Sequence, residues 1–388
     1  MRSKLAPLLG VVFCLLIGMG MVFSILAVYV QSLGAGPSMV GVMLGAFGGA
    51  RLAVNLPAGI ASERFGRRAV MLGGLVLLTL GSFGAAATTS IPLLLGCLFA
   101  QGAGTSAFVT AALAAVADLG TPESRMRDMA AYQSAQLAGI SIGPAVGGFA
   151  VAAGGFAAVF VAQGTMVVLA LALLAVNASI GTARRPAESS MARGGGTRIP
   201  EGALSLGVVT YGVFFARIAA NWVLMPLIAR EALGMSLESI GVLLTLGAVA
   251  SFAVLPLSAR AAARLGRRAM VIGTNLATIV TLVLLAGVHS VPVLWVTGIL
   301  LGATSGLAVP TLSAITADSA RPGQLGAAMG FMRTMTDLGI VTGPIAVGFV
   351  IDRLGLGYPG GLGAAALLLG AATIVFALWA PRGGGAPR

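Results

Sequence analysis

The chain has 388 residues, of which 58% are hydrophobic and only 9% are charged, and its mean hydropathy is +1.01. Soluble proteins carry about a quarter charged residues, so this composition excludes a water-soluble globular protein. A formal net charge of +12 would suit a nucleic-acid-binding protein, but here the basic residues are dispersed over the polar connections between apolar runs. The charge therefore indicates orientation in a membrane, and we expect no nucleic-acid partner.

Twelve apolar runs reach the length of about 20 residues that a helix needs to cross a bilayer. In chain order these predicted helices are 7–31, 38–61, 69–89, 91–116, 127–152, 155–178, 203–229, 237–259, 269–288, 291–316, 324–350 and 360–380. The first run follows a basic N-terminus as a secretory signal would, but it continues to Val30 and more spans follow. It is therefore predicted to be an uncleaved first helix.

One long polar stretch, 179–202, separates the first six runs from the second six, and its arginines and glycines predict a flexible linker. The domain prediction is an N-terminal six-helix bundle over 1–178, this linker, and a C-terminal six-helix bundle over 203–388. Basic residues gather in the even-numbered connections, whereas the odd-numbered ones hold only Arg230 and Arg353. By the positive-inside rule, both termini and the linker are predicted to be cytoplasmic.

The chain also repeats itself. The segment GISIGPAVGGF, from Gly139, returns 200 residues later as GIVTGPIAVGF, from Gly339. The same shift carries Gly66-Arg67-Arg68 onto Gly266-Arg267-Arg268, and Asp118 onto Asp318. A period this long indicates two homologous halves rather than a solenoid. In a membrane chain, it favours a transporter that rocks one half against the other.

Two motifs carry a family resemblance. The loop GIASERFGRR, from Gly59 to Arg68, resembles the signature of the major facilitator superfamily, with Glu63 where that family usually has aspartate. The glycine pattern around Gly143 and Pro144 resembles the motif of the family's antiporter branches, which mostly export. The resemblance implies an all-α polytopic membrane protein with 12 transmembrane helices in two pseudo-symmetric six-helix bundles. It also implies secondary active transport by alternating access.

Besides Glu63, the sequence departs from the family's pattern at two further places. In the second half, Ala263 replaces the acid of the loop motif. In the proton-coupled drug exporters, helix 4 carries an arginine three residues before a Gln-Gly pair, whereas Leu98 precedes Gln101-Gly102 here. This second departure weakens the transfer of the exporters' coupling mechanism to this chain.

The resemblance also implies roles for the two motifs. The loop would be a gate in which the acid pairs with arginine and with a helix N-terminus of the other half; the alternative is a basic turn that serves topology alone. The gating-loop residues are Gly59, Glu63, Arg64, Gly66, Arg67 and Arg68. Glycines spaced by four share one helix face, which is expected to be either a moving interface between the halves or ordinary small-residue packing. The expected helix 5 and 11 interface residues are Gly139, Gly143, Pro144, Gly147, Gly339, Gly343 and Pro344.

Charges inside predicted spans are informative because each costs about 2.5–3.5 kcal/mol to insert at mid-membrane. Asp337 is the sole acid deep in a span, four residues after Arg333, so it is either the proton-accepting group or half of a structural ion pair. Arg51 and Arg217 begin polar stripes that we expect to face a substrate cavity, where arginine suits carboxylate or phosphate groups; the alternative is that these arginines neutralise Asp337 or contact backbone. The other candidate cavity residues are Asn55, Gln101, Tyr29, Tyr132, Gln136, Asn221 and Trp222.

No cofactor or metal site is predicted, since Cys14 and Cys97 lie in apolar runs and His289 stands alone. There is no phosphate-binding loop for nucleotide hydrolysis, so energy must come from an ion gradient. We expect a multi-pass protein of a bacterial inner (plasma) membrane, not an enzyme, that exports small, largely apolar molecules in exchange for protons and functions as a monomer. The alternatives are a substrate:proton symporter or facilitator that imports a small metabolite, and a transport-inactive sensor or scaffold.

Overall fold

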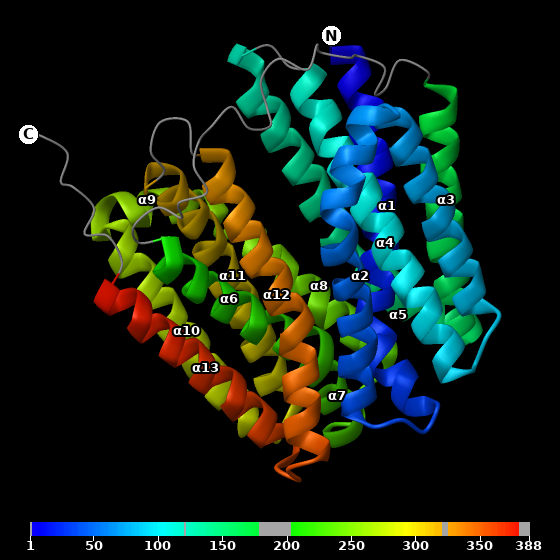
Figure 1. Cartoon of the computed structure of the whole chain (residues 1–388). Helices are drawn as coiled ribbons and strands as arrows, with labels where there is room; N and C mark the ends of the chain where they lie inside the picture. Colours follow the sequence, from blue (N-terminus) through cyan, green and yellow to red (C-terminus); the bar gives the residue numbers. More distant parts are fainter. Residues whose placement is uncertain (1, 120–121, 178–202, 320–324, 380–388) are drawn as a thin grey trace, which may run out of the picture. The chain divides into compact units, whose positions relative to one another are not determined.

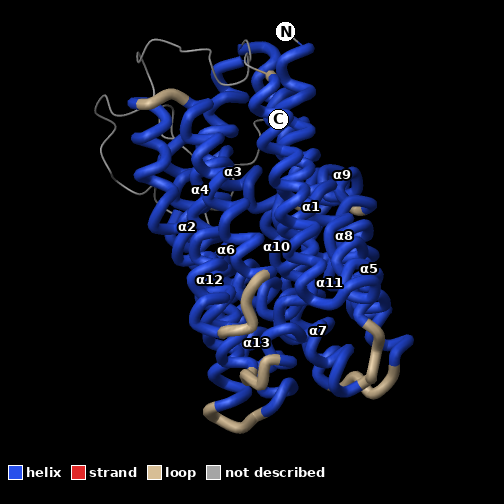
Figure 2. The backbone as a smooth tube through the Cα atoms, turned by 90° about the vertical axis from the view of Figure 1, so that its right-hand side faces the viewer, coloured by secondary structure: helices blue, strands red, loops and turns tan. Residues whose placement is uncertain are grey.

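The computed structural model describes residues 2–119, 122–177, 203–319 and 325–379, and within these ranges the secondary structure is helical with no strand (Figures 1 and 2). The predicted all-α class is thereby confirmed. The predicted linker, 179–202, lies outside the described residues.

The first half of the chain forms five helices. They are α1 (Arg2–Ser32), α2 (Pro37–Arg64), α3 (Arg67–Ala86), α4 (Ile91–Leu119) and α5 (Pro122–Val176). The apolar part of α5 has 50 residues, more than twice the length that crosses a bilayer. Its backbone leaves the helical conformation at Gly154 and at Gly155, where φ is +72°, a value that glycine adopts without steric strain. Two of the predicted spans, 127–152 and 155–178, meet at this break.

The second half contains two departures from the predicted regular helices. The span predicted over 203–229 consists of α6 (Ala203–Ile218), the π-helical η1 (Ala219–Leu224), α7 (Met225–Leu227) and the π-helical η2 (Ile228–Ala232). Pro226 lies between the two π-helical segments and offers no N–H to the α-helical ladder, which favours a local change of register. The span predicted over 237–259 divides into α8 (Leu237–Ala253) and α9 (Leu255–Leu265), with Pro256 in the first turn of α9.

The remaining helices are α10 (Arg267–Ala286), α11 (Val291–Ser319), α12 (Leu325–Asp352) and α13 (Gly357–Trp379). Among the described residues, 11 helical stretches are long and apolar enough to cross a membrane, and the stretch through α5 is long enough to cross it twice. The predicted set of 12 helices is therefore confirmed.

The chain packs as two compact units. The first comprises Met1–Glu188 and Met225–Thr245, and the second comprises Ser189–Leu224 and Leu246–Arg388. In the first unit α1 packs against α5, and α4 packs against α2 and α3. In the second, α6 packs against α12, and α10 against α11 and α13. The pairs α1–α5 and α6–α12 are equivalent under the sequence repeat, so the two halves use the same packing.

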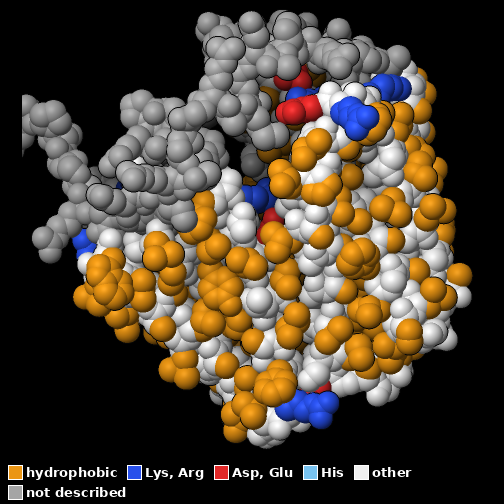
Figure 3. Space-filling view, in the orientation of Figure 1, with side chains coloured by type: hydrophobic (Ala, Val, Ile, Leu, Met, Phe, Trp, Pro, Cys, Tyr) orange, Lys and Arg blue, Asp and Glu red, His pale blue; other side chains and the backbone are white. Residues whose placement is uncertain are grey.

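Each unit has apolar side chains that are exposed on its surface as well as apolar side chains that are buried. Large residues such as Leu80, Val176 and Leu367 are more than half exposed, while others such as Leu15 and Leu26 are fully buried. Figure 3 shows hydrophobic side chains along the visible helix surfaces. Exposed apolar area on this scale is expected for helices that contact lipid acyl chains.

Candidate functional site

The predicted gating loop joins α2 to α3 and places Arg67 against two other helices. Its Nε atom lies 3.3 Å from Oδ2 of Asp118 near the end of α4, and its Nη1 atom donates to Ser62 Oγ over 2.6 Å. The Ser62 hydroxyl in turn donates to the Gly59 carbonyl over 2.8 Å. Arg67 therefore holds the ends of α2, α3 and α4 together.

The next residue, Arg68, links α3 to the end of α5 through hydrogen bonds. Its guanidinium donates to the carbonyl of Asn177 over 2.7 Å and to that of Ala175 over 2.9 Å. The last carbonyls of a helix lack intrahelical donors and carry partial negative charge, so a cation is favoured there.

The second half repeats both contacts. Arg267 forms an ion pair with Asp318, and Arg268 donates to the carbonyl of Ala377, each 200 residues beyond its first-half equivalent. The repeat identified Asp118 and Asp318 in the sequence, but sequence reasoning assigned them no role. Glu63, the acid of the loop motif, is exposed, and its role as a latch between the halves stays a prediction.

The glycines of α5 are in contact with α1. A Cβ atom on Gly139 would lie 2.7 Å from the Phe13 carbonyl, one on Gly143 2.5 Å from Gly20 Cα, and one on Gly147 2.6 Å from the Met21 carbonyl. Because side-chain carbons do not come closer than about 3 Å, only glycine permits this backbone approach.

In the second half, a Cβ atom on Gly339 would lie 2.8 Å from the Tyr211 carbonyl oxygen, and one on Gly343 would lie 2.6 Å from the Phe215 carbonyl oxygen, both in α6. Gly139, Gly143 and Gly147 contact a helix of the first half, and Gly339 and Gly343 contact a helix of the second half, which is the small-residue packing that the sequence left open. A role at an interface between the halves stays a prediction.

Residues 144–148 of the α5 glycine motif contact the first half of α8. The Ala145 N–H donates to Thr245 Oγ1 over 3.0 Å, and a Cβ on Gly148 would lie 2.5 Å from the Leu237 carbonyl. Gly241 packs against the carbonyl of Pro144. These contacts explain why Met225–Thr245 belongs to the first compact unit although it lies in the second half of the sequence. No motif or repeat in the sequence points to Thr245 or Gly241.

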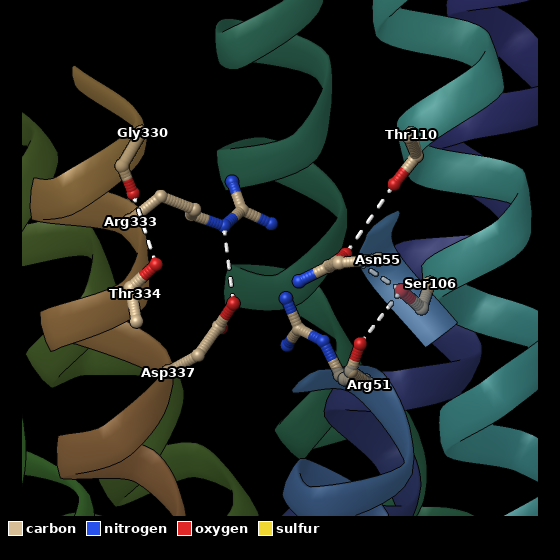
Figure 4. A network of polar contacts seen from close by, with 8 residues as sticks. All are labelled: Arg51, Asn55, Ser106, Thr110, Gly330, Arg333, Thr334 and Asp337. Carbon is tan, nitrogen blue, oxygen red and sulfur yellow. Dashed lines mark hydrogen bonds and ion pairs between the residues drawn. The ribbon is translucent and has the colours of Figure 1, made fainter. Parts of the chain in front are cut away.

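The membrane acid Asp337 lies on α12 and forms an ion pair with Arg333 (Figure 4). The distance from Arg333 Nε to Asp337 Oδ2 is 3.6 Å, and the side chains are 46% and 3% exposed, respectively. The carboxylate is therefore desolvated, whereas half of the guanidinium side chain remains accessible. Both roles predicted for Asp337, the proton carrier and the structural partner, are compatible with this geometry.

The polar stripe of α2 is connected to α4. The Ser106 hydroxyl lies 2.6 Å from Asn55 Oδ1 and 3.0 Å from the Arg51 carbonyl, and Thr110 Oγ1 donates to the same Asn55 oxygen over 3.3 Å (Figure 4). The Arg51 guanidinium carbon is 6.0 Å from the centre of the Phe47 ring. Ser106 and Thr110 are four residues apart on α4, a spacing that places both hydroxyls on one helix face and is visible in the sequence.

Arg217 stands at the end of α6, where its guanidinium carbon is 5.8 Å from the centre of the Phe214 ring. Asn221 and Trp222 follow in the π-helical η1, and all three candidate residues are partly buried. Single-turn π-helical segments occur frequently at functional sites, because they re-aim side chains without ending the helix.

The remaining candidates take part in packing within the first unit. The Tyr29 hydroxyl donates to the Thr88 carbonyl over 3.1 Å, and Gln136 Nε2 donates to Tyr132 OH over 3.2 Å. Gln101, 1% exposed, donates to the Gly81 carbonyl over 3.2 Å and accepts from Gln163 Nε2 over 3.1 Å. That these residues line a substrate cavity stays a prediction.

Comparison with known proteins gives three kinds of match. A family model described as Major Facilitator Superfamily matches residues 8–216 and again residues 207–387. Over 125 residues, the chain is 36% identical to the inner membrane transport protein YajR of Escherichia coli (strain K12), and this alignment covers 31% of the chain and 27% of YajR. Over 150 residues it is 23% identical to the quinolone resistance protein NorA of Staphylococcus aureus, covering 38% of each.

Solved structures match over nearly the whole chain. A bacterial homolog of the human lysosomal transporter Spinster, in an inward-facing and occupied conformation, has a TM-score of 0.79 at 14% identity and covers 97% of this chain and 96% of its own. The nucleoside transporter NupG has a TM-score of 0.76 at 15% identity and covers 96% of this chain and 99% of its own. At these identities, the likeness shows the fold.

Proposed function

The chain belongs to the major facilitator superfamily, and on this basis we propose that it is a secondary active transporter that exports small, largely apolar molecules in exchange for protons. Alternating access between the two halves would carry the substrate across the membrane, as the internal repeat suggests. The observation that carries the proposal is the buried carboxylate of Asp337 beside the half-exposed Arg333.

The carboxyl group of Asp337 is nearly inaccessible to water and lies 3.6 Å from the Arg333 guanidinium. A conformational change that hydrates the site or displaces Arg333 would change the surroundings of this carboxyl group, so proton uptake and release can be coupled to alternating access. Ionisable residues inside membrane spans mark such proton relays in many transporters.

The arginines in other spans favour a particular substrate chemistry. Arg51 and Arg217 each stand beside a phenylalanine ring in their own helix, so each offers a cation next to an apolar face. Guanidinium groups bind carboxylate and phosphate groups in two-pronged geometry. We therefore expect substrates that combine an apolar body with an acidic group, and weak transport of cations.

The direction of transport rests on two observations. The glycine motif of α5 and the similarity to a quinolone resistance protein both support export. Leu98, in place of the arginine of proton-coupled drug exporters, weakens the transfer of their coupling mechanism, so a symporter or facilitator that imports a metabolite is the second candidate.

The test is an untargeted measurement of metabolites and added drugs in cells with and without the protein, each with and without an uncoupler. The proposal expects at least one apolar acid at a lower internal level in cells that carry the protein, with the difference lost on uncoupling. Cells that carry Asp337→Asn serve as the control. A higher internal level in cells with the intact protein would support import instead.

A further inference from the structure

The short helix α9 begins in the last turn of one candidate membrane span, ends just before the next, and is amphipathic. It has 11 residues, the preceding candidate span ends at Ser258, and the next begins at Arg267. Leu257, Arg260 and Arg264 are spaced three and four residues apart, so they share one face of α9, and all three are exposed. Leu265, at the end of the helix, is 67% exposed. A helix of this kind is suited to lie in the interface of a bilayer.

The internal repeat supplies a comparison for this segment. At five equivalent positions, the first half has three arginines and one glutamate, whereas the second half has four arginines and no acid. The first-half residues are Ile60, Glu63, Arg64, Arg67 and Arg68, and the second-half residues are Arg260, Ala263, Arg264, Arg267 and Arg268. The second half has therefore gained two units of positive charge at this connection.

Helix packing does not account for the added charge. The packing contacts that both halves share are made by Arg267 with Asp318 and by Arg268 with the Ala377 carbonyl. Within the described part of the chain, Arg260 and Arg264 form no ion pair. Arg267 and Arg268 also occupy the first turn of α10, where the partial positive charge of the helix end already disfavours cations.

We propose that α9 binds the phosphate group of an anionic phospholipid. Arg260 and Arg264 contact the phosphate oxygens, and the side chains of Leu257 and Leu265 lie among the acyl chains. Guanidinium groups form strong, charge-assisted hydrogen bonds with phosphate. Exposed leucines beside the arginines favour a lipid over a free phosphate ion, because a soluble anion gains nothing from apolar contact. The site faces the side of the bilayer on which the basic loops gather, predicted to be cytoplasmic.

The test measures retention of phosphatidylglycerol by the purified full-length protein, using native mass spectrometry, with phosphatidylcholine as the neutral comparison. Each basic residue near an anionic surface contributes about a five-fold gain in affinity, so Arg260→Gln with Arg264→Gln should weaken phosphatidylglycerol binding about thirty-fold. Binding of phosphatidylcholine should not change. The matched control, Arg230→Gln with Arg353→Gln, removes two arginines from the odd-numbered connections and should leave phosphatidylglycerol binding as in the original protein.

A second variant keeps the test valid if the double glutamine variant fails to fold. Ala263→Glu restores the acid of the first half at an exposed position and should weaken phosphatidylglycerol binding at least about five-fold. Equal binding by the original protein and by Ala263→Glu or the double variant would overturn the proposal. Displacement of the lipid by millimolar inorganic phosphate would also overturn it, since the site would then bind a free anion.

Discussion

Asp337 and Arg333 differ sharply in exposure, and this difference predicts that the two partners respond unequally to substitution. The carboxylate is 3% exposed and the guanidinium side chain 46% exposed. Replacing Asp337 with asparagine leaves an arginine that can turn toward water. Replacing Arg333 with glutamine leaves a desolvated carboxylate without its arginine.

The magnitudes follow from this geometry. Breaking a fully buried ion pair costs about 3–5 kcal/mol, because the remaining charge stays buried. Because the Arg333 side chain is 46% exposed, Arg333→Gln should cost less than this range, but it should still lower the amount of folded protein unless Asp337 takes up a proton. For Asp337→Asn, the half-exposed arginine rehydrates, so the loss of stability should be about 1 kcal/mol, as for partners with access to solvent. Asp337→Asn should therefore be inserted and folded, but should lose proton-driven transport.

The assay combines the thermal unfolding of purified variants with export driven by an imposed pH gradient. Substrate binding should survive in Asp337→Asn, because the amide and the carboxyl are nearly equal in size. The double variant Arg333→Gln with Asp337→Asn removes both charges and should recover the stability that Arg333→Gln loses, while remaining uncoupled. Proton-driven export by this double variant at a near-original rate would show that the pair is structural and would refute the reasoning.

Three further predictions concern the motifs. Gly143→Leu should reduce folded protein rather than transport alone, because even its Cβ would lie 2.5 Å from Gly20 Cα; normal expression and unfolding temperature would contradict the close α1–α5 packing. Arg67→Ala and Asp118→Ala should each lower the unfolding temperature by a few degrees, and the double variant by no more than either alone, since the partners act on each other; strictly additive losses would mean that the contact is not formed. Glu63→Gln, at an exposed position, should lower the transport rate with no change in unfolding temperature, and an unchanged rate would reduce this loop acid to a topological signal.

The helices were predictable from the sequence because membrane spans depend on local properties. A run of apolar residues long enough to cross the bilayer meets no water there, so its backbone groups bond to one another in a helix. This holds whichever segments pack beside it. Even the break within α5, at Gly154 and Gly155, falls at the boundary between two predicted spans, 127–152 and 155–178. The repeat also predicted which residues are equivalent, and the contacts of Arg67 and Arg267 follow that equivalence.

What could not be predicted depends on which helices meet. The four-residue spacing of Gly139 and Gly143 indicates a close approach, but nothing in it identifies α1 as the partner. The acid that pairs with Arg67 lies 51 residues away, at the end of α4. The π-helical segments around Pro226 also escape prediction, because a proline in a membrane helix can equally produce a kink. Tertiary packing decides all three.

The most direct test of proton-coupled export is simultaneous measurement of both fluxes. Purified protein would be reconstituted into liposomes with a pH-sensitive dye inside, and an apolar acid identified in cells would be added as substrate. The account predicts that substrate and protons move in opposite directions, and that Asp337→Asn abolishes the proton flux. Substrate transport with no proton movement, or with protons moving in the same direction as the substrate, would contradict it.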